Sequence, residues 1–191
     1  MKRIQSFVLA AGLLTAGLAH ATPAGSIFVT EPGADGFAIN TLAFNGSSYD
    51  VSKLTFDFTA SHTTDGSHIV IDGLPTLITP PAGGSATFFG SGAVFGFNLT
   101  GFSTFQSFKF SWDPDSAIDP DYGATGLDFI GATVTALTSA GTYIGKFERV
   151  GTTLDVSASL APVPEPEGYA LVAAGLLTIG CMARRRANKS A

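Results

Sequence analysis

The chain has 191 residues and a formal net charge of −5, with 10 basic and 15 acidic side chains. The stretch from Thr22 to Pro164 is more acidic, with four basic and 13 acidic residues and a net charge of −9. Such a domain is a poor candidate for binding nucleic acid or an anionic membrane surface, because both depend on lysine and arginine. The one cysteine, Cys181, lies outside this stretch, so the domain must be stabilised by packing without a disulfide.

The N-terminus has the layout of a secretory signal peptide. Lys2 and Arg3 give it a positive start, and the stretch Phe7–Leu18 is almost wholly apolar. Ala19-His20-Ala21 then supplies the small-x-small pattern that signal peptidase cleaves. We therefore expect residues 1–21 to be a signal peptide that is removed after Ala21.

Residues 22–162 show the period-two alternation of half-buried β-strands. The apolar members of four such segments are Leu54, Phe56 and Phe58; Phe108, Phe110 and Trp112; Ala132, Val134 and Ala136; and Leu154, Val156, Ala158 and Leu160. Turn-forming pairs separate the segments, among them Asn45-Gly46, Asp65-Gly66, Asp72-Gly73 and Ala140-Gly141, and Leu77–Ser85 is expected to be a flexible connector. The pattern predicts an all-β fold: a single antiparallel β-sandwich or jelly-roll-like domain whose 15 phenylalanines lie mostly in the core.

Residues that could carry out catalysis are sparse in this domain. It has no Gly-x-Ser-x-Gly motif, no phosphate-binding glycine loop with its lysine, and no cysteine nucleophile. Glu31 and Glu148 are its only glutamates and could form a glycosidase pair only if the fold brought them together. His62 and His68 flank the Asp65-Gly66 turn, but no third metal ligand has matching spacing. We expect no enzymatic activity and assign no catalytic, cofactor-binding or metal-binding residue.

The most acidic stretch runs from Asp113 to Asp128, directly after the Phe108–Trp112 segment. Its five aspartates are Asp113, Asp115, Asp119, Asp121 and Asp128. Calcium takes six to eight oxygen ligands, which such a loop could supply, although the spacing is not that of an EF-hand. The alternative is an ordinary loop in which aspartate and proline form turns.

The C-terminus combines an apolar run with a basic stop. Tyr169–Ala183 has 15 residues, and would form a helix of about 23 Å in a hydrocarbon core of about 30 Å. It shows no polar face, and flanking side chains can extend so short a span. Arg184, Arg185 and Arg186 follow at once, so the basic end is expected in the cytoplasm and the β domain across the inner membrane.

Val163-Pro164-Glu165-Pro166, the short apolar run and the terminal arginine cluster together resemble the PEP-CTERM sorting signal of Gram-negative bacteria. The resemblance covers residues 163–187. It implies cleavage near the Pro-Glu-Pro triplet by an exosortase, after transient anchoring in the inner membrane, and then transfer to the cell surface or an extracellular matrix. Proteins similar in this respect occur in organisms that make exopolysaccharide and biofilm. The two prolines suit a processing site, because they keep the segment extended.

Three functional hypotheses follow. The first is a non-enzymatic, exosortase-processed surface or matrix protein whose β-sandwich is structural or adhesive. The second is a calcium-assisted, lectin-like module that binds exopolysaccharide through the Asp113–Asp128 stretch and aromatics such as Tyr122. The third is a hydrolase or lyase acting on that polysaccharide through Glu31 or Glu148.

Overall fold

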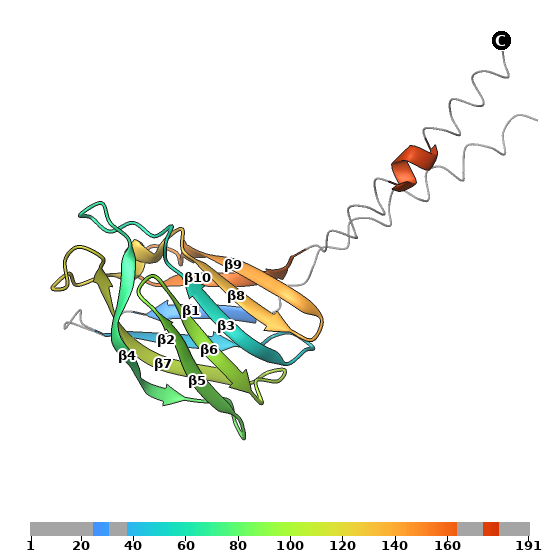
Figure 1. Ribbon diagram of the computed structural model, residues 1–191, viewed down its shortest axis with the longest axis horizontal. Helices are drawn as coiled ribbons and strands as arrows, with labels where there is room; N and C mark the ends of the chain where they lie inside the picture. Colours follow the sequence, from blue (N-terminus) through green and yellow to red (C-terminus); the bar gives the residue numbers. More distant parts are fainter. Residues whose placement is uncertain (1–24, 31–37, 164–173, 180–191) are drawn as a thin grey trace, which may run out of the picture.

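The computed structural model describes residues 25–30, 38–163 and 174–179, and within them the fold is all-β (Figure 1). The strands are β1 (Gly25–Thr30), β2 (Ile39–Phe44), β3 (Val51–Asp57), β4 (Ile69–Thr79), β5 (Ser85–Ser91), β6 (Val94–Thr100), β7 (Ser107–Ser116), β8 (Thr133–Thr138), β9 (Gly141–Arg149) and β10 (Val156–Pro162). A short 3-10 helix, η2 (Gly126–Phe129), precedes β8.

These strands form one antiparallel sheet in the order β4-β7-β2-β1-β10-β9-β8-β3-β6-β5. The sheet doubles over, so its two terminal strands approach each other. The Ile71 N–H, on β4, donates to the carbonyl of Gly92, beside β5, at 3.1 Å. The antiparallel all-β prediction is confirmed at this level.

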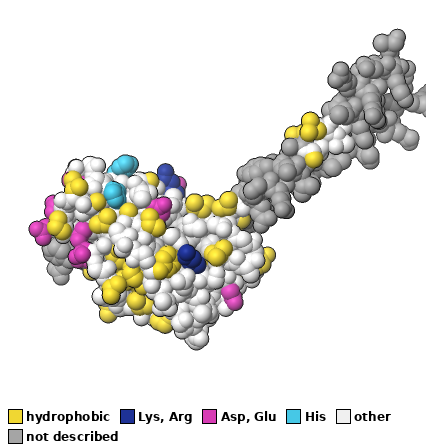
Figure 2. All heavy atoms as spheres, in the orientation of Figure 1, with side chains coloured by type: hydrophobic (Ala, Val, Ile, Leu, Met, Phe, Trp, Pro, Cys, Tyr) yellow, Lys and Arg dark blue, Asp and Glu magenta, His cyan; other side chains and the backbone are white. Residues whose placement is uncertain are grey.

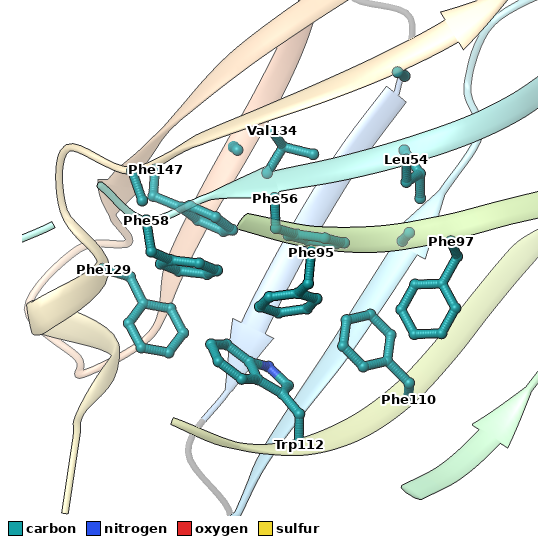
Figure 3. Close-up of a cluster of buried hydrophobic side chains, with 14 of the residues drawn as sticks. Leu54, Phe56, Phe58, Phe95, Phe97, Phe110, Trp112, Phe129, Val134 and Phe147 are labelled. Carbon is teal, nitrogen blue, oxygen red and sulfur yellow. The ribbon is translucent and has the colours of Figure 1, made fainter. Parts of the chain in front are cut away.

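The core lies between the two halves of the doubled sheet, as Figure 3 shows. Alternation over parts of β3, β6 and β7 turns the large side chains inward, and most of these are aromatic. Phe95 lies 4.9 Å from Trp112 and Phe97 lies 4.7 Å from Phe110, measured between ring centroids. Such pairs add about 0.5–1.5 kcal/mol each beyond the area they bury.

The expectation that phenylalanine fills the core is confirmed for nine residues: Phe56, Phe58, Phe95, Phe97, Phe102, Phe108, Phe110, Phe129 and Phe147. Three local predictions are wrong. Leu154 is 45 % exposed and precedes β10. Asp72-Gly73 is not a turn between strands but a bulge inside β4, where the pairing with β7 shifts between Asp72 and Thr76. The connector after β4 is shorter than Leu77–Ser85, because β4 continues to Thr79.

Strand directions give the domain two ends. We call the first the terminal pole: it comprises loops 45–50, 80–84 and 101–106, turn 139–140, and the two chain ends at Gly25 and Val163. The other is the distal pole: loops 58–68, 117–132 and 150–155 and turn 92–93. Because adjacent strands are antiparallel, every connection falls at one pole or the other.

The terminal segments predicted to meet a membrane lie mostly outside the described residues. This holds for residues 1–24 of the expected signal peptide region and for 164–173 and 180–191 of the expected tail. Residues 174–179 are helical and exposed. Among the described residues, no helix has the length and apolarity needed to span a bilayer.

Candidate functional site

The two ends of the domain emerge side by side at the terminal pole. β1 pairs with β10, and Gly25, its first residue, lies opposite Leu160. The Val163 N–H donates to the Thr142 carbonyl at 2.8 Å, one residue beyond the end of β10. Of the predicted sorting and cleavage residues, the described part of the chain includes Val163 alone; Pro164, Glu165, Pro166, Arg184, Arg185, Arg186, Ala19 and Ala21 lie outside it.

A single buried amide, Asn45, holds the loops of the terminal pole together. Asn45 is 1 % exposed, and its Nδ2 donates to the carbonyls of Phe102 at 2.7 Å and Tyr49 at 2.8 Å. Its backbone N–H donates to Gln106 at 3.0 Å, and its carbonyl accepts from the Phe105 N–H at 2.7 Å. Side-chain and backbone groups of one residue therefore fasten loop 45–50 to loop 101–106.

Three aromatic side chains project from this pole into solvent. Phe44, Tyr49 and Phe105 are 39 %, 44 % and 76 % exposed, and the Phe44 and Phe105 rings lie 6.3 Å apart. Phe105 has a φ of 62°, in the left-handed region that bulky residues rarely adopt. Sequence reasoning missed this cluster, because its members come from the end of β2 and from two loops and have no common spacing.

The distal pole contains the acidic stretch, and Figure 2 shows its carboxylates gathered on the left of the molecule. The strand before this stretch is longer than predicted. β7 runs through Pro114 to Ser116, so Asp113 and Asp115 are strand residues rather than loop residues. Asp113 lies opposite Asp72 of β4, so two aspartates occupy paired positions on adjacent strands.

Burial and mutual repulsion change the acidity of these groups. Asp115 is 5 % exposed, and burial, with smaller contributions from the charges of Asp113 and Asp72, raises its pKa to about 6. Burial and the Asp72 charge also raise the pKa of Asp113. In contrast, hydrogen bonds from the Ser116 and Thr63 side chains lower the pKa of Asp65. The surroundings therefore make two neighbouring carboxylates of this pole weaker acids than usual and make a third a stronger acid.

Asp128, the last of the five aspartates, serves the fold. It is 7 % exposed and accepts hydrogen bonds at Oδ2 from the N–H and hydroxyl of Thr125, at 2.8 and 3.1 Å, in a capping box at the start of η2. Its Oδ1 accepts from the Tyr122 hydroxyl at 3.1 Å. The Tyr122 oxygen in turn accepts from the Thr64 N–H at 3.1 Å. Tyr122 thus links the two large distal loops, and its ring is partly buried against the core.

The remaining sequence candidates are not brought together. His62 and His68 contact the neighbouring loop through backbone groups: the His62 N–H donates to Asp128 and the His68 carbonyl accepts from Ala117. Within residues 25–30, 38–163 and 174–179, no three His, Cys, Asp or Glu side chains are grouped to hold a metal ion. Glu148 is exposed on β9, and Glu31 lies outside the described residues.

A pocket of about 370 Å³ lies on the outer face of the sheet, where β4 bulges away from β7. Its lining consists of Asn40, Thr41, Leu42, Leu77, Thr79, Lys109, Phe110 and Ser111. Lys109 is the only acidic or basic side chain among these lining residues, so the pocket offers a small polar ligand one cation and several hydroxyls.

No family model, curated protein or solved structure matches this chain.

Proposed function

We propose that the chain is an exported protein that its tail anchors in the inner membrane until an exosortase cleaves it near Pro164-Glu165-Pro166. Signal peptidase removes residues 1–21 first. The released domain, residues 22–162, is a non-enzymatic β-sandwich of jelly-roll-like type. It works as a structural or adhesive module at the cell surface or in an exopolysaccharide matrix.

The observation that carries the proposal is where the domain ends. The hydrogen bond from the Val163 N–H to the Thr142 carbonyl lies directly before the Pro-Glu-Pro triplet. Proline has no N–H to donate, so Pro164 and Pro166 cannot extend the ladder of β10. A protease that cuts at the triplet therefore cuts beyond the end of β10 and leaves all ten described strands intact.

The pairing of β1 with β10 supports attachment of both ends of the domain to the same membrane. Since Gly25 lies opposite Leu160, the signal peptide and the tail are attached to the same pole. One membrane can then hold the signal peptide until its removal and the tail until its cleavage, with the domain on one side of it. If the two ends of the domain lay at opposite poles, one of them would have to run the length of the domain to reach the same membrane.

The doubled sheet supports the β-sandwich assignment and a structural role. Its facing halves bury packed aromatic rings, among them Phe56, which meets Phe110 edge to face with the ring centroids 5.5 Å apart. The acidic stretch, which suggested calcium and carbohydrate binding, uses Asp128 and Tyr122 to connect loops. These two side chains therefore have a part in stability, which favours the structural hypothesis over the lectin-like one.

The test is replacement of Pro164-Glu165-Pro166 by three alanines, with cell fractionation and the intact mass of the surface form as readouts. We expect the wild-type surface form to lack Arg184, Arg185 and Arg186, and the variant to stay full length in the membrane fraction. Glu167→Ala, which removes the neighbouring charge outside the triplet, is the matched control and should be processed normally. Release of the triple-alanine variant at the wild-type rate would refute the proposal.

A further inference from the structure

The exposed aromatic cluster of the terminal pole has no role in the fold described so far. We name Phe44, Tyr49 and Phe105 the terminal aromatic patch. Phe105 is 76 % exposed, yet its backbone is fixed by the hydrogen bond from its N–H to Asn45. A rigid loop that presents a large apolar ring to solvent, in a strained left-handed conformation, is typical of a contact surface.

Further exposed apolar side chains lie at the same pole. Leu137, Ile144 and Val163 are 45 %, 45 % and 44 % exposed. Ile144 of β9 lies opposite Ala161 of β10, and Leu137 of β8 lies opposite Thr142, whose carbonyl accepts the Val163 N–H. The apolar rim therefore reaches the point at which the chain leaves the domain.

Charge distinguishes this pole from the rest of the domain. Among the described residues Asp50 is the one carboxylate of the terminal pole, and Lys53 and Lys109 lie on the adjoining halves of β3 and β7. The net charge of the domain predicts poor binding to a membrane surface, but the structure collects the other described carboxylates in the distal half. The terminal pole itself has no excess of negative charge to repel lipid headgroups.

The tail sets the distance between this pole and the bilayer. Only residues 164–168 separate Val163 from the apolar run that starts at Tyr169. Five residues span at most about 18 Å when fully extended. A tether this short keeps the patch next to the membrane at a high effective concentration, so that even a weak contact is populated.

We infer that the terminal aromatic patch docks onto the lipid interface of the membrane that holds the tail, and so orients the domain with its acidic pole outward. The inference rests on the tether of the proposed function. Phenylalanine, tyrosine and aliphatic side chains partition to the interface between headgroups and acyl chains, which fits the composition of the patch. Cleavage near Pro164 removes the tether and leaves only this weak contact, so docking ends with processing.

The test uses the full chain in phosphatidylcholine vesicles, with and without bromine on the acyl chains as a fluorescence quencher. Trp112 is the only tryptophan of the chain and is 2 % exposed, so its emission is a constant background. Phe105→Trp adds a fluorophore to the patch. Ile118→Trp, at a 70 % exposed position of the distal pole, is the matched control.

We expect the emission added by Phe105→Trp to shift to the blue and to be largely lost with brominated lipid. The emission added by Ile118→Trp should be unchanged. Flotation of the same samples separates the two claims. A chain that floats with the vesicles while both added tryptophans stay unquenched is tethered but not docked, which overturns the inference alone. A chain that does not float overturns the tether, and the docking with it.

Discussion

The two poles of the domain are held together by different chemistry. At the terminal pole the connecting group is the neutral amide of Asn45, bonded to backbone carbonyls of Tyr49 and Phe102. At the distal pole carboxylates connect the loops, and the outer face of β4 and β7 brings Asp72, Asp113 and Asp115 close together. The first connection contains no titratable group, whereas the raised pKa values of Asp113 and Asp115 make stability at the distal pole depend on pH. The end that we place at the membrane is thus held together by a group that does not titrate.

The largest effect is expected from Asn45→Ala. The change removes two side-chain hydrogen bonds to buried or partly buried carbonyls and separates the loops of the terminal pole, which should cost about 3–4 kcal/mol. The measurement is the free energy of unfolding from denaturant titration. Asn98→Ala, at an exposed position of β6, is the control and should change stability by less than about 0.5 kcal/mol. Equal effects of the two substitutions would show that Asn45 does not organise the pole.

Asp128→Ala tests the corresponding connection at the distal pole. The variant loses three hydrogen bonds, from the N–H and hydroxyl of Thr125 and from the Tyr122 hydroxyl, and we expect a loss of about 2–3 kcal/mol. Asp121→Ala removes an exposed carboxylate of the same loop and should have little effect on the free energy of unfolding. If both variants unfold alike, Asp128 is not the cap that the geometry describes.

Asp115→Asn should stabilise the protein at neutral pH. Because the folded-state pKa of Asp115 is raised to about 6, the folded chain holds the proton more tightly than the unfolded chain does. The penalty is absent below about pH 4, grows as pH rises, and reaches about 2–3 kcal/mol above about pH 6. The asparagine variant should gain about this amount at pH 7 and lose the dependence between those limits.

Unfolding free energies measured across this pH range check the prediction, with Asp50→Asn, at an exposed position of the terminal pole, as the control for loss of a charge. Asp113 also lowers stability as pH rises, since its pKa is raised like that of Asp115. Asp65 has the opposite effect: its pKa is lowered, so its charged form stabilises the folded state at pH values above the ordinary pKa of aspartate. A parallel pH profile for the wild type and Asp115→Asn would contradict the assignment.

The smallest effect concerns Phe105→Asn. Asparagine tolerates the left-handed backbone that Phe105 adopts, and the ring makes little buried contact, so we expect a gain of up to about 1 kcal/mol. The same variant should lose the docking of the terminal pole to vesicles. Thermal unfolding gives the first value, and quenching by brominated lipid of a Tyr49→Trp reporter in the tethered full chain gives the second. A clearly destabilised variant would mean that the exposed ring supports the fold.

Alternation along single strands predicted much of the fold, because each inward position is set by its own neighbours in sequence. It correctly assigned the buried faces of β3, β8 and the first part of β7. The sequence analysis placed a loop directly after Phe108–Trp112, whereas β7 continues through Pro114 to Ser116. Pro114 has no N–H and would not fit a central strand. β2 reaches no further than Trp112, so β7 pairs only with β4 beyond that point and accommodates the proline.

The terminal aromatic patch could not be predicted in this way. Its geometry depends on Asn45 bonding to Phe102, a contact between loops far apart in sequence. Asn45-Gly46 is recognisable as a turn, but nothing in its pattern identifies the partner. Likewise, the pKa of Asp115 depends on a strand pairing that the bulges of β4 make hard to recognise from the sequence. The sorting residues, in contrast, can be predicted from the sequence, since the signal consists only of their order along the chain.

The pairing of β1 with β10 also constrains when the domain can fold. Ile27 lies opposite Ala158, so the strand synthesised first completes its ladder with the strand synthesised last. Bringing these two strands together costs loop-closure entropy before their contacts can form, and sheets with such long-range pairing fold slowly. A chain threaded through a membrane channel with its N-terminus leading stays open, its phenylalanines unprotected, until Leu160 has emerged. In the proposed export, completion of the fold would therefore report that translocation of the whole domain has finished.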